Sequence, residues 1–228
     1  EGFKNAFIFT TKFTLVSIVI VNVVGFSLAL LVTRKLKMSN FMRTIFFMPN
    51  LIGGLILGFI WQFIFVGVFQ TIGEAFNINF LQGWLSNEKT GFWGLVIILT
   101  WQMAGYLMVI YIAALQNIPK ELIEASEIDG ANAWERVRHI IIPMVAPAFT
   151  ISIFLTLANS FKLFDQNLAL TNGGPGNATE MLALNIYKTA FTFSKYGEAQ
   201  AKSIVFFIVV AGITLVQVYF SKKKEVEM

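Results

Sequence analysis

The sequence predicts an all-α transmembrane fold, a polytopic bundle of five membrane-spanning helices with one helix-forming loop on the cytoplasmic side. Only 13% of the 228 residues are charged and 56% are hydrophobic, whereas soluble globular chains have about 25% charged residues. A membrane helix needs about 20 apolar residues, and uncharged windows of that length occur five times. These runs lack strict alternation and are longer than barrel strands of about ten residues. Lipid is therefore the expected solvent for most of the chain.

The five expected spans form one transmembrane domain that covers the whole chain, 1–228. Each span is the core of one apolar window between charged or turn-forming segments. The spans are placed at about 14–33, 45–65, 92–115, 144–163 and 203–220.

The positions of Lys and Arg predict how the bundle is oriented. Four basic residues lie in the loop at 34–43, three in the loop at 116–142 and three in the tail after the last span. Short loops rich in Lys and Arg remain in the cytoplasm, so these segments are expected inside and the loop at 165–201 outside. The parity then places Glu1 outside without a signal peptide of the usual form. We therefore expect that a sixth, N-terminal span is missing from this chain; the alternative is a five-span protein.

The second span contains residues that interrupt helices. Pro49 removes a helical hydrogen bond and kinks the segment. Gly54 and Gly58 are a pair of small residues four apart, which lets two helix backbones approach closely. Either a hinge that moves or plain packing inside the bundle would explain this pattern.

Polar side chains within spans three and four are candidates for a transport pathway. Such residues are expensive in lipid and usually face a cavity or another helix. Three residues of span four share one face at i, i+4 and i+7, and two of span three are one turn apart. The predicted pathway, suited to a hydroxyl-rich cargo, comprises Gln102, Tyr106, Thr156, Ser160 and Leu163. The alternative for each residue is a contact between helices.

The inner loop at 117–142 is longer and more charged than a simple connection requires. Apolar residues recur at three- and four-residue steps over 118–128, beside a face that carries three glutamates. Gly130 permits a turn into a second short helix at about 132–142. A rigid helix with apolar and acidic faces suits a cleft in a partner protein. The alternative is a helix lying on lipid, which the glutamates disfavour because the cytoplasmic leaflet is negative.

The outer loop at 165–201 contains a sharp turn. Gly173, Gly174 and Pro175 follow one another, and this combination cannot continue a helix. The later part of the loop is apolar enough to lie on, or dip into, the outer surface.

Two loops resemble segments of ATP-binding-cassette importer permeases. The inner loop resembles the EAA loop of that family, with matches at Glu124, Ala125, Asp129, Gly130, Ala131 and Pro143 and mild departures at Ser126 and Val137. The outer loop resembles the Thr-x-Gly-Gly-Pro segment of the carbohydrate branch, the maltose and multiple-sugar type. Here it is Thr171-Asn-Gly-Gly-Pro175, followed by Asn185-Ile-Tyr-Lys-Thr-Ala-Phe191.

The resemblance implies a permease subunit of a carbohydrate importer in the bacterial plasma membrane. It implies a second permease, two cytoplasmic ATPases and an extracellular solute-binding protein as partners, besides carbohydrate and the lipid membrane. ATP would bind to the partners, and this sequence contains no Gly-x-x-x-x-Gly-Lys-[Ser/Thr] loop. The residues expected to couple this chain to the ATPase are Glu121, Glu124, Ala125, Ser126, Asp129, Gly130, Ala131 and Pro143.

Two other classes of function are weighed against the importer. An ion-coupled secondary transporter would need buried carboxylates, yet none of the 13 acidic residues falls within a predicted span core. An intramembrane enzyme would need catalytic groups, but the chain has no cysteine and a single histidine, His139. The same inventory gives no reason to expect a metal site or a cofactor, and no basic surface indicates a nucleic-acid partner.

Overall fold

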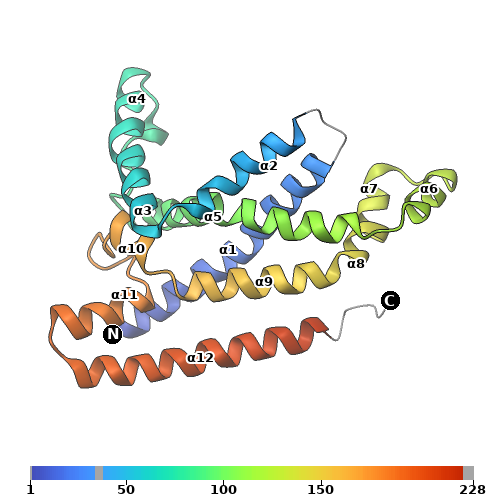
Figure 1. Cartoon of the computed structure of the whole chain (residues 1–228). Coiled ribbons are helices and arrows are strands. Elements are labelled where there is room, and N and C mark those ends of the chain that lie inside the picture. Colours follow the sequence, from blue (N-terminus) through green and yellow to red (C-terminus); the bar gives the residue numbers. More distant parts are fainter. Residues whose placement is uncertain (1, 34–37, 223–228) are drawn as a thin grey trace.

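The computed structural model of the chain describes residues 2–33 and 38–222, with side chains up to residue 219. Within these residues every regular element is helical and no strand is present (Figure 1). Four helices are long and apolar enough to cross a membrane, and a bent pair, 133–144 with 146–161, makes a fifth if it counts as one span. The all-α transmembrane prediction is therefore confirmed.

The helices follow one another along the chain with short connections. They are α1 (Gly2–Thr33), α2 (Ser39–Phe47), α3 (Gly54–Phe63), α4 (Phe69–Ala75), α5 (Glu88–Gln116), α6 (Lys120–Ile128), α7 (Ala133–Arg136), α8 (Ile142–Met144), α9 (Ala146–Phe161), α10 (Asp165–Leu170), α11 (Leu182–Tyr187) and α12 (Tyr196–Lys222). Shorter 3-10 or π turns are η1 (Met48–Leu51), η2 (Ile64–Val68), η3 (Asn79–Leu81), η4 (Val137–Ile141) and η5 (Lys188–Thr192).

The bundle is built around α1, α5 and α9, with α12 packed against α9 (Figure 1). The most extensive contact is between α1 and α5. It buries Phe13 and Val21 of α1 with Leu95, Leu107 and Tyr111 of α5, all with no exposed surface. Because every α-helix satisfies its own backbone, these helices can meet through side chains alone in an apolar solvent.

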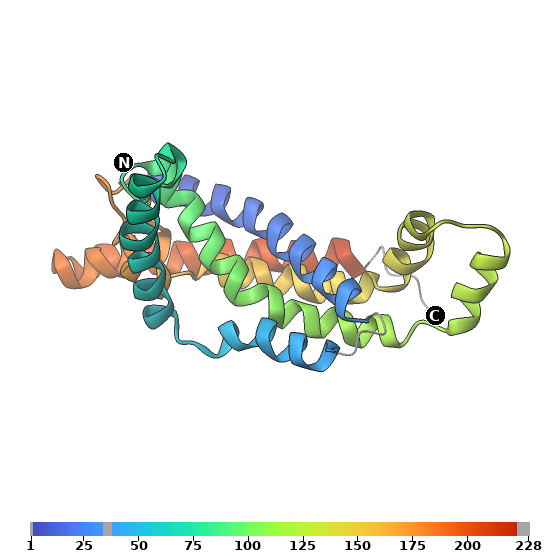
Figure 2. The ribbon, with the colours of Figure 1, turned by 90° about the horizontal axis from the view of Figure 1, so that it is seen from above.

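The two ends of the bundle are distinct. The end of α1, the start of α2, the α6–α7 loop and the end of α12 lie at one end, and α10 and α11 lie at the other (Figures 1 and 2). The described residues that belong to or flank the three segments predicted to be cytoplasmic thus share one end. Five of the basic residues behind that prediction, Arg34, Lys35, Lys37, Lys223 and Lys224, lie outside the described residues. The direction in which the bundle crosses the membrane stays a prediction.

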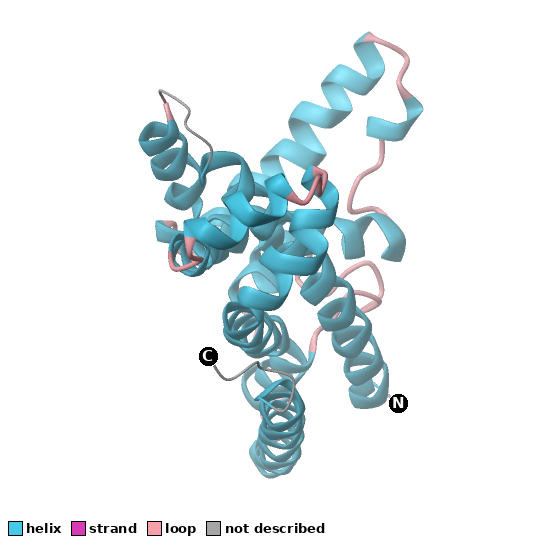
Figure 3. Cartoon of the chain, turned by 90° about the vertical axis from the view of Figure 1, so that its right-hand side faces the viewer, coloured by secondary structure: helices cyan, strands magenta, loops and turns pink. Residues whose placement is uncertain are grey.

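The second span departs from the predicted helix at 45–65. Helix α2 ends at Phe47, η1 follows, and Ile52 and Gly53 are extended before α3 begins. Pro49 has no N–H to continue the α2 ladder, and Gly53 adopts φ −60° and ψ 141°. The continuous apolar helix is instead 54–75. It projects sideways from the end of the bundle where α10 lies (Figures 1 and 3).

The remaining spans extend beyond or fall short of their predicted cores. Helix α1 begins at Gly2 rather than near residue 14, and α12 begins at Tyr196 rather than near residue 203. The span predicted at 144–163 is α9, which is separated from the helix before it by a bend of 73°. Pro147 lies in the first turn of α9, where a proline is tolerated because the first N–H groups have no helical partner.

Replacing Gly105 by Ala is expected to lower stability, because α2 crosses α5 at this position. A Cβ at Gly105 would overlap the carbonyl oxygen of Phe46 and lie 2.9 Å from the Phe47 nitrogen. Overpacking typically costs about 1–3 kcal/mol. The measurement is the thermal unfolding midpoint of the purified protein in detergent. The matched control is Gly212→Ala in α12, where nothing lies within 4 Å of the added Cβ. Equal midpoints for the two variants would contradict the close α2–α5 contact.

Candidate functional site

A cavity of about 490 Å³ lies where α3, α5, α9 and α10 meet. Its position is close to the break at the start of α3 and to the break between α9 and α10. Much of its lining can form hydrogen bonds. The polar lining residues are Asn50, Gln102, Tyr106, Asn159, Lys162, Asp165 and Gln166.

Close packing of α10 on α3 forms one wall of this cavity. A Cβ at Gly54 would lie 2.8 Å from the Asp165 Cβ, and one at Gly58 would overlap the Ala169 Cβ. The two glycines therefore allow the backbones of α3 and α10 to approach closely, as small residues do between membrane helices. Of the two alternatives for this glycine pair, the structure shows packing. Pro49 is buried in η1, at the break that precedes α3.

Gln102 joins three segments at the inner wall of the cavity. Its Nε2 donates to the carbonyl oxygen of Ile52 at 3.2 Å, and its Oε1 accepts from Gln166 Nε2 at 2.6 Å. Ile52 lies in the break before α3, so the amide of Gln102 satisfies a carbonyl oxygen where the helix is interrupted. Gln102 lines the cavity, but its oxygen and one of its N–H groups are already engaged.

Two residues of the predicted pathway do not line the cavity. Thr156 and Ser160 have no exposed surface, and Thr156 accepts a hydrogen bond from Asn22 of α1 at 3.3 Å. With Ser152 they form an i, i+4, i+8 row on the packed side of α9, so the structure does not bring these two residues to the cavity.

Residues on another side of α9 face the cavity. Leu155 and Asn159 line it from α9, and Lys162 and Leu163 line it from the break that follows the helix. Leu163 belongs to the predicted pathway, whereas Asn159 and Lys162 were not included in it. Both sides of α9 carry polar residues, and spacing alone could not show which side packs against α1.

A buried polar contact connects the three central helices. The Tyr111 hydroxyl donates to Asn22 Oδ1 at 2.7 Å, and Asn22 Nδ2 donates to Thr156 Oγ1 at 3.3 Å. Thr156 Oγ1 in turn donates to the Ser152 carbonyl oxygen at 2.8 Å. These bonds run from α5 to α1 to α9 and fix how the helices are rotated against one another.

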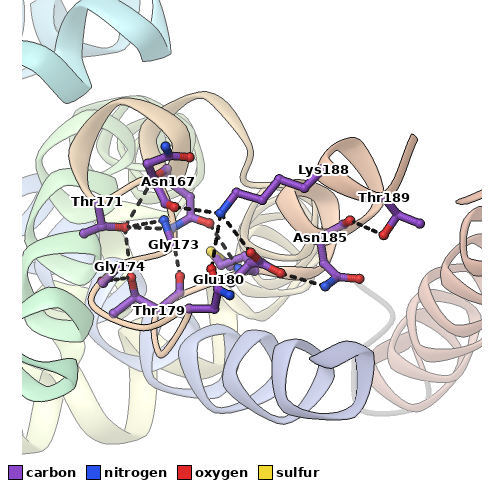
Figure 4. A network of polar contacts seen from close by, with 12 residues as sticks. Asn167, Thr171, Gly173, Gly174, Thr179, Glu180, Asn185, Lys188 and Thr189 are labelled. Carbon is purple, nitrogen blue, oxygen red and sulfur yellow. Dashed lines mark hydrogen bonds and ion pairs between the residues drawn. The ribbon is translucent and has the colours of Figure 1, made fainter. Parts of the chain in front are cut away.

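At the opposite end from α6 and α7, a network of polar contacts closes the outer loop (Figure 4). Lys188 Nζ lies 2.9 Å from Glu180 Oε2 and donates to the Asn172 carbonyl oxygen at 2.9 Å. The other carboxylate oxygen of Glu180 accepts from Asn185 Nδ2 at 2.6 Å. One more bond, from Lys202 Nζ to Thr189 Oγ1 at 2.9 Å, connects this network to α12.

The predicted turn lies inside this network. Gly173 has φ +79°, a left-handed conformation that favours glycine, and Gly174 N donates to the Thr171 carbonyl oxygen at 2.8 Å. Asn167 of α10 then holds the returning chain, because its Nδ2 donates to the Thr179 carbonyl oxygen and its Oδ1 accepts from Met181 N. The sharp turn at Gly173, Gly174 and Pro175 is confirmed.

The α6–α7 loop projects beyond the bundle as two short helices (Figures 1 and 2). Gly130 has φ +81°, and Ala131 N donates to the Ser126 carbonyl oxygen at 2.9 Å, which together end α6. Asn132 begins α7 with a capping box that includes Glu135. An ion pair from Arg136 to Glu127, at 3.0 Å, joins the two helices.

The tip of this loop exposes large apolar side chains. Ile128 is 87% exposed and Trp134 is 67% exposed. Most of the residues predicted to contact a partner are also exposed, including Glu121, Glu124, Ala125, Asp129 and Pro143. Two are less accessible, because Ala131 is half-buried and Ser126 is buried, with its hydroxyl donating to the Ile123 carbonyl oxygen. The sequence did not single out Trp134, although a large aromatic residue in a polar loop is a usable signal.

Across residues 2–33 and 38–222, no group of three His, Cys, Asp or Glu residues is placed to hold a metal ion. The described residues offer hydrogen-bonding and charged groups in the cavity. At the other end of the bundle, the tip of the α6–α7 loop offers an exposed apolar surface.

Comparisons with known proteins agree with this geometry. The family described as "Binding-protein-dependent transport system inner membrane component" matches residues 21–225. A probable starch degradation products transport system permease protein of Thermoanaerobacterium thermosulfurigenes is 62% identical over 99% of this chain and 77% of its own length. A multiple sugar-binding transport system permease protein of Streptococcus mutans is 32% identical over 98% and 78%.

A solved structure has a similar fold. It is a bacterial alginate ABC transporter in complex with an alginate pentasaccharide-bound periplasmic protein. One of its chains superposes with a TM-score of 0.87 at 20% identity, over 98% of this chain and 79% of that one.

Tyr111→Phe is expected to destabilise the bundle while leaving the ring packed against Phe26 and Phe149. The substitution removes only the donor to Asn22, and hydrogen bonds between membrane helices contribute about 0.6 kcal/mol on average and up to about 1.7. We expect a loss of about 1 kcal/mol, measured as a lower unfolding midpoint in detergent. Tyr106→Phe is the matched control on the same helix, because no described residue bonds to its hydroxyl. The same midpoint for both variants would argue against the Tyr111–Asn22 contact.

Proposed function

The chain belongs to the family of binding-protein-dependent transport system inner membrane components, and we propose that it is the permease subunit of an ATP-driven carbohydrate importer. Its apolar helices cross the inner membrane, and its role is transport. The observation that carries the proposal is the high identity, along nearly the whole chain, to a permease named for starch degradation products. Membership of this family favours the importer over an ion-coupled secondary transporter.

The cargo is a carbohydrate, and the cavity is the proposed part of its path. Tyr106, Asn159, Lys162 and Asp165 line it with polar groups that form no ion pair with the described residues. Sugar hydroxyls both donate and accept hydrogen bonds, so hydroxyl, amide and charged groups together suit them. Gln102 and Leu163 complete the proposed lining, whereas Thr156 bonds to Asn22 of α1 and Ser160 is buried.

The α6–α7 loop is the proposed coupling element, which docks into a cytoplasmic ATPase. An exposed Ile128 and Trp134 beside Glu121, Glu124 and Asp129 give an apolar centre with an acidic rim, a composition typical of an interface. In this proposal Gly130, Ala131 and Ser126 shape the loop, while Ala125 and Pro143 flank the contact. ATP is bound and hydrolysed by two ATPase partners.

Two further partners follow from the proposal. A second permease subunit completes the membrane path, and a solute-binding protein delivers cargo to the end of the bundle that carries α10 and α11. Residues 165–201 face that protein outside the cell. This orientation places the α6–α7 loop in the cytoplasm.

Asn159→Ala is expected to weaken carbohydrate uptake, whereas the neighbouring Ser160→Ala should not. Asn159 lines the cavity, whereas Ser160 has no exposed surface and does not line it. A lost hydrogen bond costs about 1 kcal/mol, which is about fivefold in affinity. The measurement is the half-saturating maltooligosaccharide concentration for uptake into proteoliposomes that contain the permeases, ATPases and binding protein. Equal uptake by both variants and the wild type would remove this cavity from the path.

Ile128→Asp is expected to detach the ATPase without unfolding the permease, since the side chain is 87% exposed. An anchor residue at an interface contributes about 2 kcal/mol or more, so affinity should fall more than tenfold. The measurement is the amount of ATPase that co-purifies with the permease. Phe193→Asp, at the opposite end and 63% exposed, is the control and should retain the ATPase. Unchanged co-purification with Ile128→Asp would rule out docking at this tip.

A further inference from the structure

The break between α9 and α10 brings two opposite charges to the rim of the cavity. Lys162 follows the last residue of α9, and Asp165 is the first residue of α10. Both side chains are exposed, and both line the cavity. In a continuous helix, residues 162 and 165 would be neighbours on one helix face. The break between α9 and α10 therefore places the two charges at the cavity.

Neither charge has a partner within the described chain. The four ion pairs among the described residues include neither Lys162 nor Asp165, and no hydrogen bond from either side chain is formed. By contrast, Glu180 and Lys188 at the same end of the bundle meet at 2.9 Å. Charged side chains near a membrane interior are expensive, and those that persist usually face a cavity with a function.

Helix ends explain why the charges are tolerated but not why they remain free. Both charges interact favourably with the helix dipoles, because Asp165 lies in the first turn of α10 and Lys162 follows the last turn of α9. The Asp165 backbone is held by close packing, since even a Cβ on Gly54 would approach the Asp165 Cβ to 2.8 Å. The carboxylate and the ammonium therefore keep their hydrogen-bonding capacity for something that enters the cavity.

We propose that Lys162 and Asp165 form a charged but net-neutral subsite that makes the cavity selective for uncharged, hydroxyl-rich oligosaccharides. A carboxylate accepts hydrogen bonds from sugar hydroxyls and an ammonium donates to them, and such charge-assisted bonds are stronger than neutral ones. A neutral sugar satisfies both groups together. A sugar that bears a carboxylate is attracted by Lys162 but repelled by Asp165.

This subsite rests on the proposed function, and its test compares two cargoes that differ only in charge. One is a neutral maltooligosaccharide, and the other is the same oligosaccharide carrying one carboxylate. The assembled transporter is reconstituted in proteoliposomes with the same binding protein throughout. The measured quantity is the ratio of charged to neutral uptake, so the selectivity of the binding protein cancels when a variant is compared with the wild type.

Asp165→Asn is expected to raise that ratio several-fold, because Lys162 is then unopposed. Lys162→Met is expected to lower it several-fold, and the double variant should return it towards the wild-type value. Asp165→Glu, which keeps the charge, should preserve the ratio. Lys89→Met is the control for loss of an exposed lysine outside the cavity and outside residues 165–201, and it should leave the ratio unchanged.

A structural role in the α9–α10 break would reduce uptake of both cargoes equally, and an unchanged ratio in both single variants would overturn the subsite. If Asp165→Asn does not assemble with its partners, the uptake ratio of Lys162→Met alone tests the subsite. The Lys162 side chain is exposed and forms no described hydrogen bond or ion pair, so its replacement should not disturb assembly. Wild-type vesicles that import neither cargo would overturn the proposed function and the subsite with it. Import by the wild type with no shift in the variants would overturn the subsite alone.

Discussion

The structure depends on one constraint, which is that a backbone polar group inside a membrane must find its partner within the protein. Uninterrupted helices meet this constraint by themselves, and interrupted helices need help from side chains. At the break before α3 the amide of Gln102 bonds to the Ile52 carbonyl oxygen, and at the end of α10 the amide of Gln62 bonds to the Leu170 carbonyl oxygen at 3.2 Å. These glutamine amides bond to carbonyl oxygens that a continuous helix would satisfy by itself. The helices can therefore be interrupted beside the polar cavity.

Composition and spacing were enough to predict the helical class, the two informative loops and the turn at Gly130, because each follows from local chemistry. They were not enough to place the second span, since the uncharged run at 44–73 does not show where its helix is interrupted or where it leaves the bundle. They also placed Thr156 in the predicted pathway, whereas the structure buries it in contact with Asn22 of α1. A helix with polar residues on two sides has no unique rotation until its neighbours are known, and here Asn22 and Tyr111, far away in sequence, determine it.

The two ends of the molecule are connected by rigid elements rather than by loops. Helix α9 has 16 residues, a length of about 24 Å at 1.5 Å per residue. It begins at the bend that follows the α6–α7 loop and ends at the break beside the cavity. Helix α5 likewise runs from the end of the bundle that carries α10 and α11, past Gln102 and Tyr106, to the start of that loop. In the proposed coupling, movement of the projecting loop is carried to the cavity by these two helices, whose rotation the Tyr111–Asn22–Thr156 contact fixes.

The ammonium group of Lys188 affects how the end of the bundle that carries α10 and α11 responds to force. It is shared between the carbonyl oxygen of Asn172 and the carboxylate of Glu180, and the next residue, Thr189, is bonded to Lys202 of α12. These contacts close residues 172–188 into a ring that is also attached to α12. Force on one part of a closed ring is carried to each residue through which the ring bonds to a neighbouring helix. A displacement of this segment therefore acts on α12 through Lys202 and on α10 through Asn167, which bonds to Thr179 and Met181.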